Sequence, residues 1–183
     1  MASEMPGALA LLVTSMIANP SAPTLQEFEA VLARHDSATV ALEEWCDARR
    51  LAKPATVTAT LMPPTTQQTP AALADVFGKE ALSLRHVRLS CGGTVLSIAW
   101  NWYASALLTP QMNAALAQGN VPFGKVIAPL GFRRVALSIT AGPANNCPAD
   151  TISTHQAKLV LPDGRALAYL VECYTAANLA ARR

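Results

Sequence analysis

The chain has 183 residues, of which 51% are hydrophobic and only 14% are charged, and its formal net charge is +2. These values predict one globular domain over residues 1–183, with enough apolar material for a sizeable core. Lys and Arg form no basic stripe with interleaved aromatic residues, which argues against a nucleic-acid partner. The four cysteines form no CxxC pair and have no His at metal-ligand spacing, so no zinc site is expected. Buried thiols are favoured, and two disulfides stay open as the alternative.

An apolar run from Gly7 to Ala18 is too short to span a bilayer but has the length of a secretory signal core. The residues before it include Glu4 and no Lys or Arg, and no clean A-x-A cleavage site follows it. The run therefore predicts a buried first helix in a cytoplasmic protein without a membrane span. Export with cleavage of this segment stays open as the alternative.

Capping signals and hydrophobic periodicity predict the other helices. Thr24 and Glu27 form a capping box, Asp36 or Ser37 can cap the next helix, and Thr109 precedes a proline in a first turn. The predicted helical segments are 24–34, 36–50, 70–77 and 109–118. Residues 121–124 are expected to form a turn, and 125–130 are ambiguous.

Alternating and β-branched residues predict about six strands in antiparallel hairpins, and hence an α+β domain. The longest hairpin covers residues 82–103 around a Cys-Gly-Gly turn, and a second one turns at Pro-Asp-Gly-Arg, residues 162–165. The other strand segments are 54–62, 132–140, 155–161 and 167–174. The chain contains no GxGxxG, P-loop, GxSxG or HExxH motif, so these nucleotide-binding, hydrolase and protease classes have no support.

Two charged residues interrupt apolar strands. Arg85 shares one strand face with Val87 and Leu89 by the two-residue period, and Glu172 stands in the apolar strand near the end of the chain. A charge on an inward face is costly unless it is paired. Either Arg85 and Glu172 form a buried ion pair, or they contact a ligand, which for the arginine would be acidic.

Four segments, in order, resemble motifs of the chorismate lyase family. They are DSAT at 36–39, LRHVRL at 84–89 with Gly93 at the turn, VPFG at 121–124, and DGR at 163–165 leading to ECY at 172–174. The resemblance implies an enzyme that converts chorismate to 4-hydroxybenzoate and pyruvate for ubiquinone biosynthesis. It also implies a small antiparallel sheet with helices packed on one side and an enclosed ligand pocket.

The resemblance assigns roles by position. Arg85 matches the arginine that holds the ring carboxylate, and Glu172 matches the glutamate that faces the leaving side chain or the product hydroxyl. A bidentate guanidinium suits a carboxylate, and a positioned acid or base in a dry pocket could suffice for the reaction. The implied protein is a monomer that takes a small aromatic carboxylate and needs no metal or cofactor. Its other expected substrate-binding residues are Ser37, Ala38, Thr39, Phe123 and Gly124.

The chain departs from the family at several positions. Ala38 stands where the enzymes tend to carry methionine, Trp100 and Asn101 where they tend to carry an arginine, and His155 begins a replaced arginine pair. Chorismate carries two carboxylates, so the missing cations matter. The residues that could compensate are Lys125, Arg133, Arg134 and His155. The alternative function is a non-catalytic binding protein of the same fold, like the effector-sensing domains of certain bacterial transcription regulators.

Overall fold

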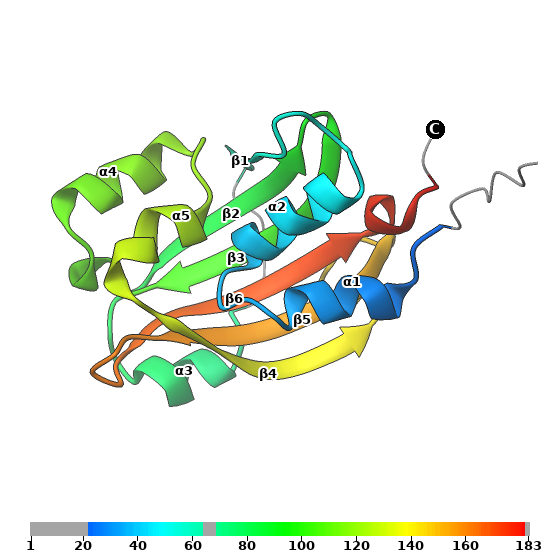
Figure 1. The fold of residues 1–183 in the computed structure, drawn as a ribbon. Helices are drawn as coiled ribbons and strands as arrows, with labels where there is room; N and C mark the ends of the chain where they lie inside the picture. Colours follow the sequence, from blue (N-terminus) through cyan, green and yellow to red (C-terminus); the bar gives the residue numbers. More distant parts are fainter. Residues whose placement is uncertain (1–21, 64–68, 182–183) are drawn as a thin grey trace, which may run out of the picture.

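The computed structural model of the chain describes residues 22–63 and 69–181. Within this part, six strands form one antiparallel sheet in the order β1-β2-β3-β6-β5-β4 (Figure 1). The strands are β1 (Val57–Leu61), β2 (Ser83–Cys91), β3 (Thr94–Tyr103), β4 (Arg133–Ala141), β5 (Thr151–Val160) and β6 (Ala166–Thr175). The predicted α+β class with a six-stranded antiparallel sheet is confirmed. The helix predicted in the apolar run before residue 19 lies outside the described residues.

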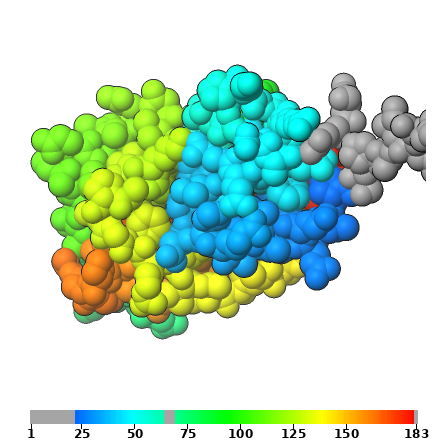
Figure 2. All heavy atoms as spheres, viewed as in Figure 1, coloured from blue at the N-terminus to red at the C-terminus, as the bar shows by residue number. Residues whose placement is uncertain are grey.

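Helices cover the sheet unequally. Figure 2 shows the face on which α1 and α2 lie beside α5, so that the strands behind them are largely hidden. The helices are α1 (Leu25–Leu32), α2 (Ala38–Ala48), α3 (Ala72–Phe77), α4 (Pro110–Gln118) and α5 (Phe123–Ile127), with 3-10 turns at Ser105–Leu107, Ala128–Leu130 and Ala176–Leu179. On the opposite face, Leu73 of α3 packs against Trp100, Trp102 and Tyr169. The helix α3 therefore departs from the expected packing of helices on one side of the sheet, because the opposite face of the sheet is also apolar.

Local capping signals place the helices beside the sheet. Thr24 Oγ1 accepts a hydrogen bond from the Glu27 amide at 3.2 Å, and the Glu27 carboxylate accepts one from the Thr24 amide at 2.7 Å. Ser37 caps α2, and Thr109 caps α4 by accepting from the Met112 amide at 3.2 Å. The capping-box and N-cap predictions are confirmed, since each cap satisfies an amide that has no partner inside the helix.

The strand register fixes which side chains face the larger set of helices. Arg85 lies opposite Asn101, and Val87 lies opposite Ala99, which in turn lies opposite Glu172 on the next strand. The expected inward position of Arg85 is confirmed, because this residue is only 3% exposed. The interior between the sheet and the helices therefore contains a guanidinium and a carboxylate among apolar side chains.

The four cysteines form two disulfides, so the expectation of buried thiols is wrong. Cys46 is bonded to Cys91, and Cys147 is bonded to Cys173. The two pairs are 45 and 26 residues apart in the sequence, a spacing that no local pattern reveals. Among the described residues, no helix is long and apolar enough to cross a bilayer.

Candidate ligand pocket

A pocket lies between the sheet and the first turns of α2 and α5. Its empty volume is about 410 Å³, a value that includes open solvent at its mouth. Most of its walls are apolar, formed by Val87, Leu89, Phe123, Phe132, Leu159 and Leu170. Its polar groups come from Asp36, Ser37, Thr39, Asn101, Arg134 and Glu172. A largely apolar lining with a few convergent polar groups is typical of small-molecule sites.

The five residues expected to bind substrate through the family resemblance all line this pocket. They are Ser37, Ala38, Thr39, Phe123 and Gly124. The first three begin α2, whereas Phe123 and Gly124 begin α5, so two helix starts that are distant in sequence meet over the same cavity. Phe123 therefore begins a helix and does not lie in the predicted turn. The prediction missed this helix because its five residues carry no side-chain cap.

The helix starts approach each other closely at Gly124. A Cβ atom placed on Gly124 would lie 2.5 Å from Ser37 Oγ and 3.2 Å from Thr39 Oγ1. The missing side chain, rather than an unusual backbone angle, is what the packing requires here. Gly124 thus allows α5 to cover the pocket beside the N-terminal turn of α2.

Arg85 and Glu172 do not pair with each other. Their strands are separated by β3, and Arg85 lies two residues further along the sheet than the position opposite Glu172. With strands about 4.8 Å apart and a rise of about 3.4 Å per residue, their backbones are about 12 Å apart. Glu172 lines the pocket, and Arg85 lies just beyond its lining, beside Asn101. The alternative of a mutual ion pair is therefore wrong.

The Arg85 guanidinium is buried with most of its hydrogen-bonding capacity unused. Its Nη2 donates to the carbonyl oxygen of Val121 at 2.7 Å, while Nε and Nη1 have no hydrogen-bond partner in the structure. The side-chain oxygen of Asn101 is also buried without a partner. Burial lowers the pKa of Arg85 below its ordinary value, and the nearby Tyr103 only partly offsets this effect. Unpaired buried donors of this kind are costly, and an anionic group beside them would remove that cost.

Glu172 has its own partner in Arg134. The two side chains form a two-point ion pair, with Arg134 Nη1 3.2 Å from one carboxylate oxygen and Nη2 in closer contact with the other. The Tyr174 hydroxyl donates to the same carboxylate at 3.1 Å. Burial raises the pKa of Glu172, but the charge and hydrogen bonds of Arg134 outweigh this and hold the pKa below its ordinary value. Glu172 is therefore ionised, which suits a hydrogen-bond acceptor better than a general acid.

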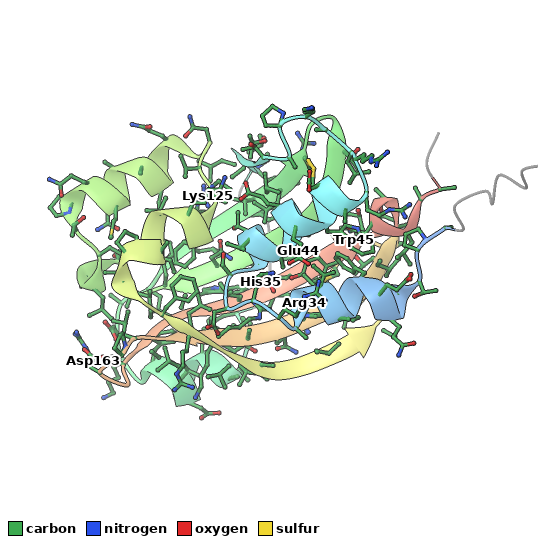
Figure 3. All side chains as sticks on the ribbon, viewed as in Figure 1. Arg34, His35, Glu44, Trp45, Lys125 and Asp163 are labelled. Carbon is green, nitrogen blue, oxygen red and sulfur yellow. A yellow bond between two sulfur atoms is a disulfide. The ribbon has the colours of Figure 1, made fainter. Side chains whose placement is uncertain are left out.

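Arg134 is the only one of the four compensating cations proposed from the sequence that lines this pocket. Lys125 points toward α2 and pairs with Glu43 at 2.5 Å (Figure 3). His155 Nε2 lies 2.8 Å from a Glu29 carboxylate oxygen, facing a neighbouring groove. Arg133 is exposed. The sequence could identify four candidate cations but could not show that Arg134 is the one in the pocket, because Arg134 reaches Glu172 across an intervening strand.

Other clusters of titratable side chains in the described part of the chain connect elements of the fold to one another. Figure 3 shows Arg34 and His35 directed toward Glu44, which joins the end of α1 to α2. His155 uses the same ring nitrogen toward Ser153 Oγ, at 3.1 Å, and toward Glu29. A nucleophilic triad needs both ring nitrogens, so this group does not form one. Within residues 22–63 and 69–181, no group of three or more His, Cys, Asp or Glu side chains could hold a metal ion.

No protein-family model matches the chain. The uncharacterized protein y4mC of Sinorhizobium fredii is 33% identical over 178 residues, and the match covers 82% of this chain and 73% of y4mC. Among solved structures, the effector domain of PhnF from Mycobacterium smegmatis matches 77% of this chain and 89% of its own, with a TM-score of 0.51 and 14% identity. A structure of PhnF from Mycobacterium smegmatis gives a TM-score of 0.52 at 14% identity, over 80% of this chain and 66% of PhnF. These likenesses identify the chorismate-lyase-like fold, as the sequence motifs implied.

Proposed function

The chain belongs to the family of the Sinorhizobium fredii protein y4mC. We propose that it is a binding domain for a small aromatic carboxylate. The observation that carries the proposal is the buried guanidinium of Arg85, whose Nε and Nη1 have no partner beside an apolar pocket. Nε and Nη1 donate on opposite sides of the guanidinium, so a ligand carboxylate would accept a charge-assisted hydrogen bond from one of them, and a second only from the adjacent Nη2. Arg85 is the proposed anchor.

The rest of the pocket supports an aromatic ligand with a second polar group. Phe123 and Phe132 line the cavity, and aliphatic side chains from four strands form the floor. The Arg134–Glu172 pair offers both a donor and an acceptor to a substituent at a distance from the anchor. A ring that has a carboxylate at one end and a hydroxyl at the other, as in 4-hydroxybenzoate, matches this arrangement. Ser37, Ala38, Thr39 and Gly124 would close over it.

Binding without turnover is favoured over chorismate cleavage. A general acid at the ether oxygen would need to be protonated near neutral pH, and Arg134 keeps Glu172 ionised. The similar solved structures include the effector domain of a regulator, which agrees in fold with a domain that binds a ligand without changing it. The lyase reaction stays a prediction of the sequence resemblance.

Isothermal titration calorimetry with 4-hydroxybenzoate, benzoate and 4-hydroxybenzamide tests the proposal. The amide keeps the ring and hydroxyl but has no negative charge, so we expect the acids to bind and the amide to bind at least about tenfold more weakly. Incubation with chorismate, followed by chromatography of the products, should give no 4-hydroxybenzoate above the uncatalysed rate. The absence of binding heat from both acids would contradict the proposal, and rapid turnover would restore the lyase hypothesis.

A further inference from the structure

We propose that this domain matures and acts in an oxidising compartment, where the Cys46–Cys91 disulfide holds the pocket's cover helix on the pocket's floor. The role of the Cys46–Cys91 bond at the pocket rests on the function proposed above. The pairing of the cysteines and the oxidising compartment are independent of that function. All four cysteines of the chain are in the described part and all are paired. Complete pairing is typical of proteins from oxidising compartments, since cytosolic thiols are kept reduced.

The backbone positions of the paired cysteines are compatible with disulfide bonds. The Cα–Cα distances are 6.3 Å for Cys46–Cys91 and 5.6 Å for Cys147–Cys173, both within the range that a disulfide spans without backbone movement. Each pair connects elements that are remote in sequence, one between a helix and a strand and the other between a loop and a strand. The N-terminal sequence led us to expect a cytoplasmic protein, with export as the alternative. The pairing of all four cysteines favours export.

The Cys46–Cys91 disulfide connects the two walls of the candidate pocket. Cys46 lies in the third turn of α2, whose first turn covers the cavity through Ser37 and its neighbours. Cys91 ends β2, the strand that contributes Val87 and Leu89 to the floor. Figure 3 draws a disulfide between α2 and the sheet, at the end of the helix remote from the pocket. Loss of this bond would leave α2 attached to the sheet by packing and by the hydrogen bond that the Val57 amide of β1 donates to Glu43 at 2.9 Å.

The Cys147–Cys173 disulfide offers a matched control on the other face of the sheet. Cys173 follows Glu172 in β6, so it points away from the pocket and packs in the cluster of Trp100, Trp102 and Tyr169. Cys147 lies in the connection between β4 and β5 and is only half-buried, whereas Cys46 and Cys91 are both fully buried. A reductant should therefore reach this second bond first, and its loss should leave the pocket's cover in place.

Each bond forms when two thiols lose two protons and two electrons to a thiol–disulfide oxidant. An oxidised dithiol oxidoreductase of the compartment serves as that oxidant: its disulfide is attacked by one cysteine thiolate, a mixed disulfide forms, and the second thiolate displaces the oxidoreductase as a dithiol. One oxidant disulfide is consumed for each protein disulfide. Under the reducing conditions of a bacterial cytosol the reverse exchange would return four thiols.

The compartment is tested with the full chain produced in a bacterial host, once as it stands and once behind an added export leader, with alkylation of free thiols at lysis. We expect two mapped disulfides and protease resistance in the exported protein, and four alkylated thiols with rapid proteolysis in the cytosolic protein. A cytosolic protein with four thiols that resists protease and binds 4-hydroxybenzoate as tightly as the exported one would overturn the proposal.

The role of the α2 bond is tested by comparing Cys46→Ala/Cys91→Val with Cys147→Ala/Cys173→Val, both of which keep the buried volume apolar. Hydrogen exchange at the α2 amides should accelerate by about tenfold or more in the first variant and stay within about twofold in the second. The affinity for 4-hydroxybenzoate should fall in the first variant and stay close to the wild-type value in the second. Equal changes in α2 hydrogen exchange in the two variants would overturn the proposal that the Cys46–Cys91 bond holds α2 over the pocket. If wild-type protein binds no benzoate, the proposed function fails, while thiol mapping and exchange still decide this inference.

Discussion

Arg134 and Glu172 form a two-point ion pair that crosses over β5, joining the edge strand β4 to the centre of the sheet in β6. Their side chains are only 12% and 6% exposed. The backbone amide of Arg134 donates to an Asp36 carboxylate oxygen at 2.7 Å, which ties the connection between α1 and α2 to the same strand. The pair therefore fixes one end of the candidate pocket.

Glu172→Gln should strongly destabilise the fold. The substitution keeps the shape of the side chain but removes the carboxylate bonded to the buried Arg134 and leaves only Asp36 as a nearby negative charge. Breaking similar buried pairs costs about 3–5 kcal/mol. Urea denaturation would measure the loss in the free energy of unfolding. Glu80→Gln, at an exposed position, is the control and should change stability by no more than about 0.5 kcal/mol. Equal stability of the two variants would show that the pair is not formed in solution.

The stability of the wild-type protein should fall in acid, partly through Glu172. Its pKa in the folded state lies below the ordinary value of 4.5. The ionised carboxylate thus contributes stability that is fully present above pH 4.5 and is lost as the pH falls through the folded-state pKa. Unfolding free energies measured between pH 6 and pH 3 should decline more steeply for wild type than for Glu172→Gln. Parallel curves would contradict the lowered pKa of Glu172.

Gly124→Ala should disturb the closure of the pocket. The new methyl group would meet Ser37 Oγ at 2.5 Å, and Ser37 is the residue that caps α2, so either the cap or the helix contact must yield. We expect a loss of about 1 kcal/mol or more, similar to that of a lost N-cap, together with weaker binding of 4-hydroxybenzoate. Adding Ser37→Gly removes the obstructing hydroxyl, so the double variant should cost less than the sum of the single ones. Strict additivity would argue against this contact.

Local sequence signals predicted most of the secondary structure. Thr24 with Glu27, Ser37 and Thr109 cap helices because their side chains bond amides only a few residues away, which a single sequence can reveal. The long hairpin was equally accessible, since its strands alternate around two glycines. By contrast, the short α5 has no side-chain cap and depends on packing against α2.

The candidate site was predictable as a set of residues but not as a set of contacts. Through the resemblance, Ser37 and Phe123 were expected to share a site, and both line the pocket. The partner of Glu172 was not predictable, because Arg134 reaches it across β5 and the register of two strand pairs decides that distance. The cysteine pairs depend on equally remote contacts. Non-local pairing is fixed by the assembled sheet, which no short motif contains.

The central claim, that Arg85 is an anchor for a ligand carboxylate, is tested most directly by Arg85→Met. Methionine fills similar apolar space without the two unpaired donors, so the variant should unfold at the same urea concentration as wild type or a higher one. Its affinity for 4-hydroxybenzoate, measured by calorimetry on the same samples, should fall at least about tenfold, equivalent to about 1.4 kcal/mol. Unchanged affinity in a folded Arg85→Met protein would contradict the claim.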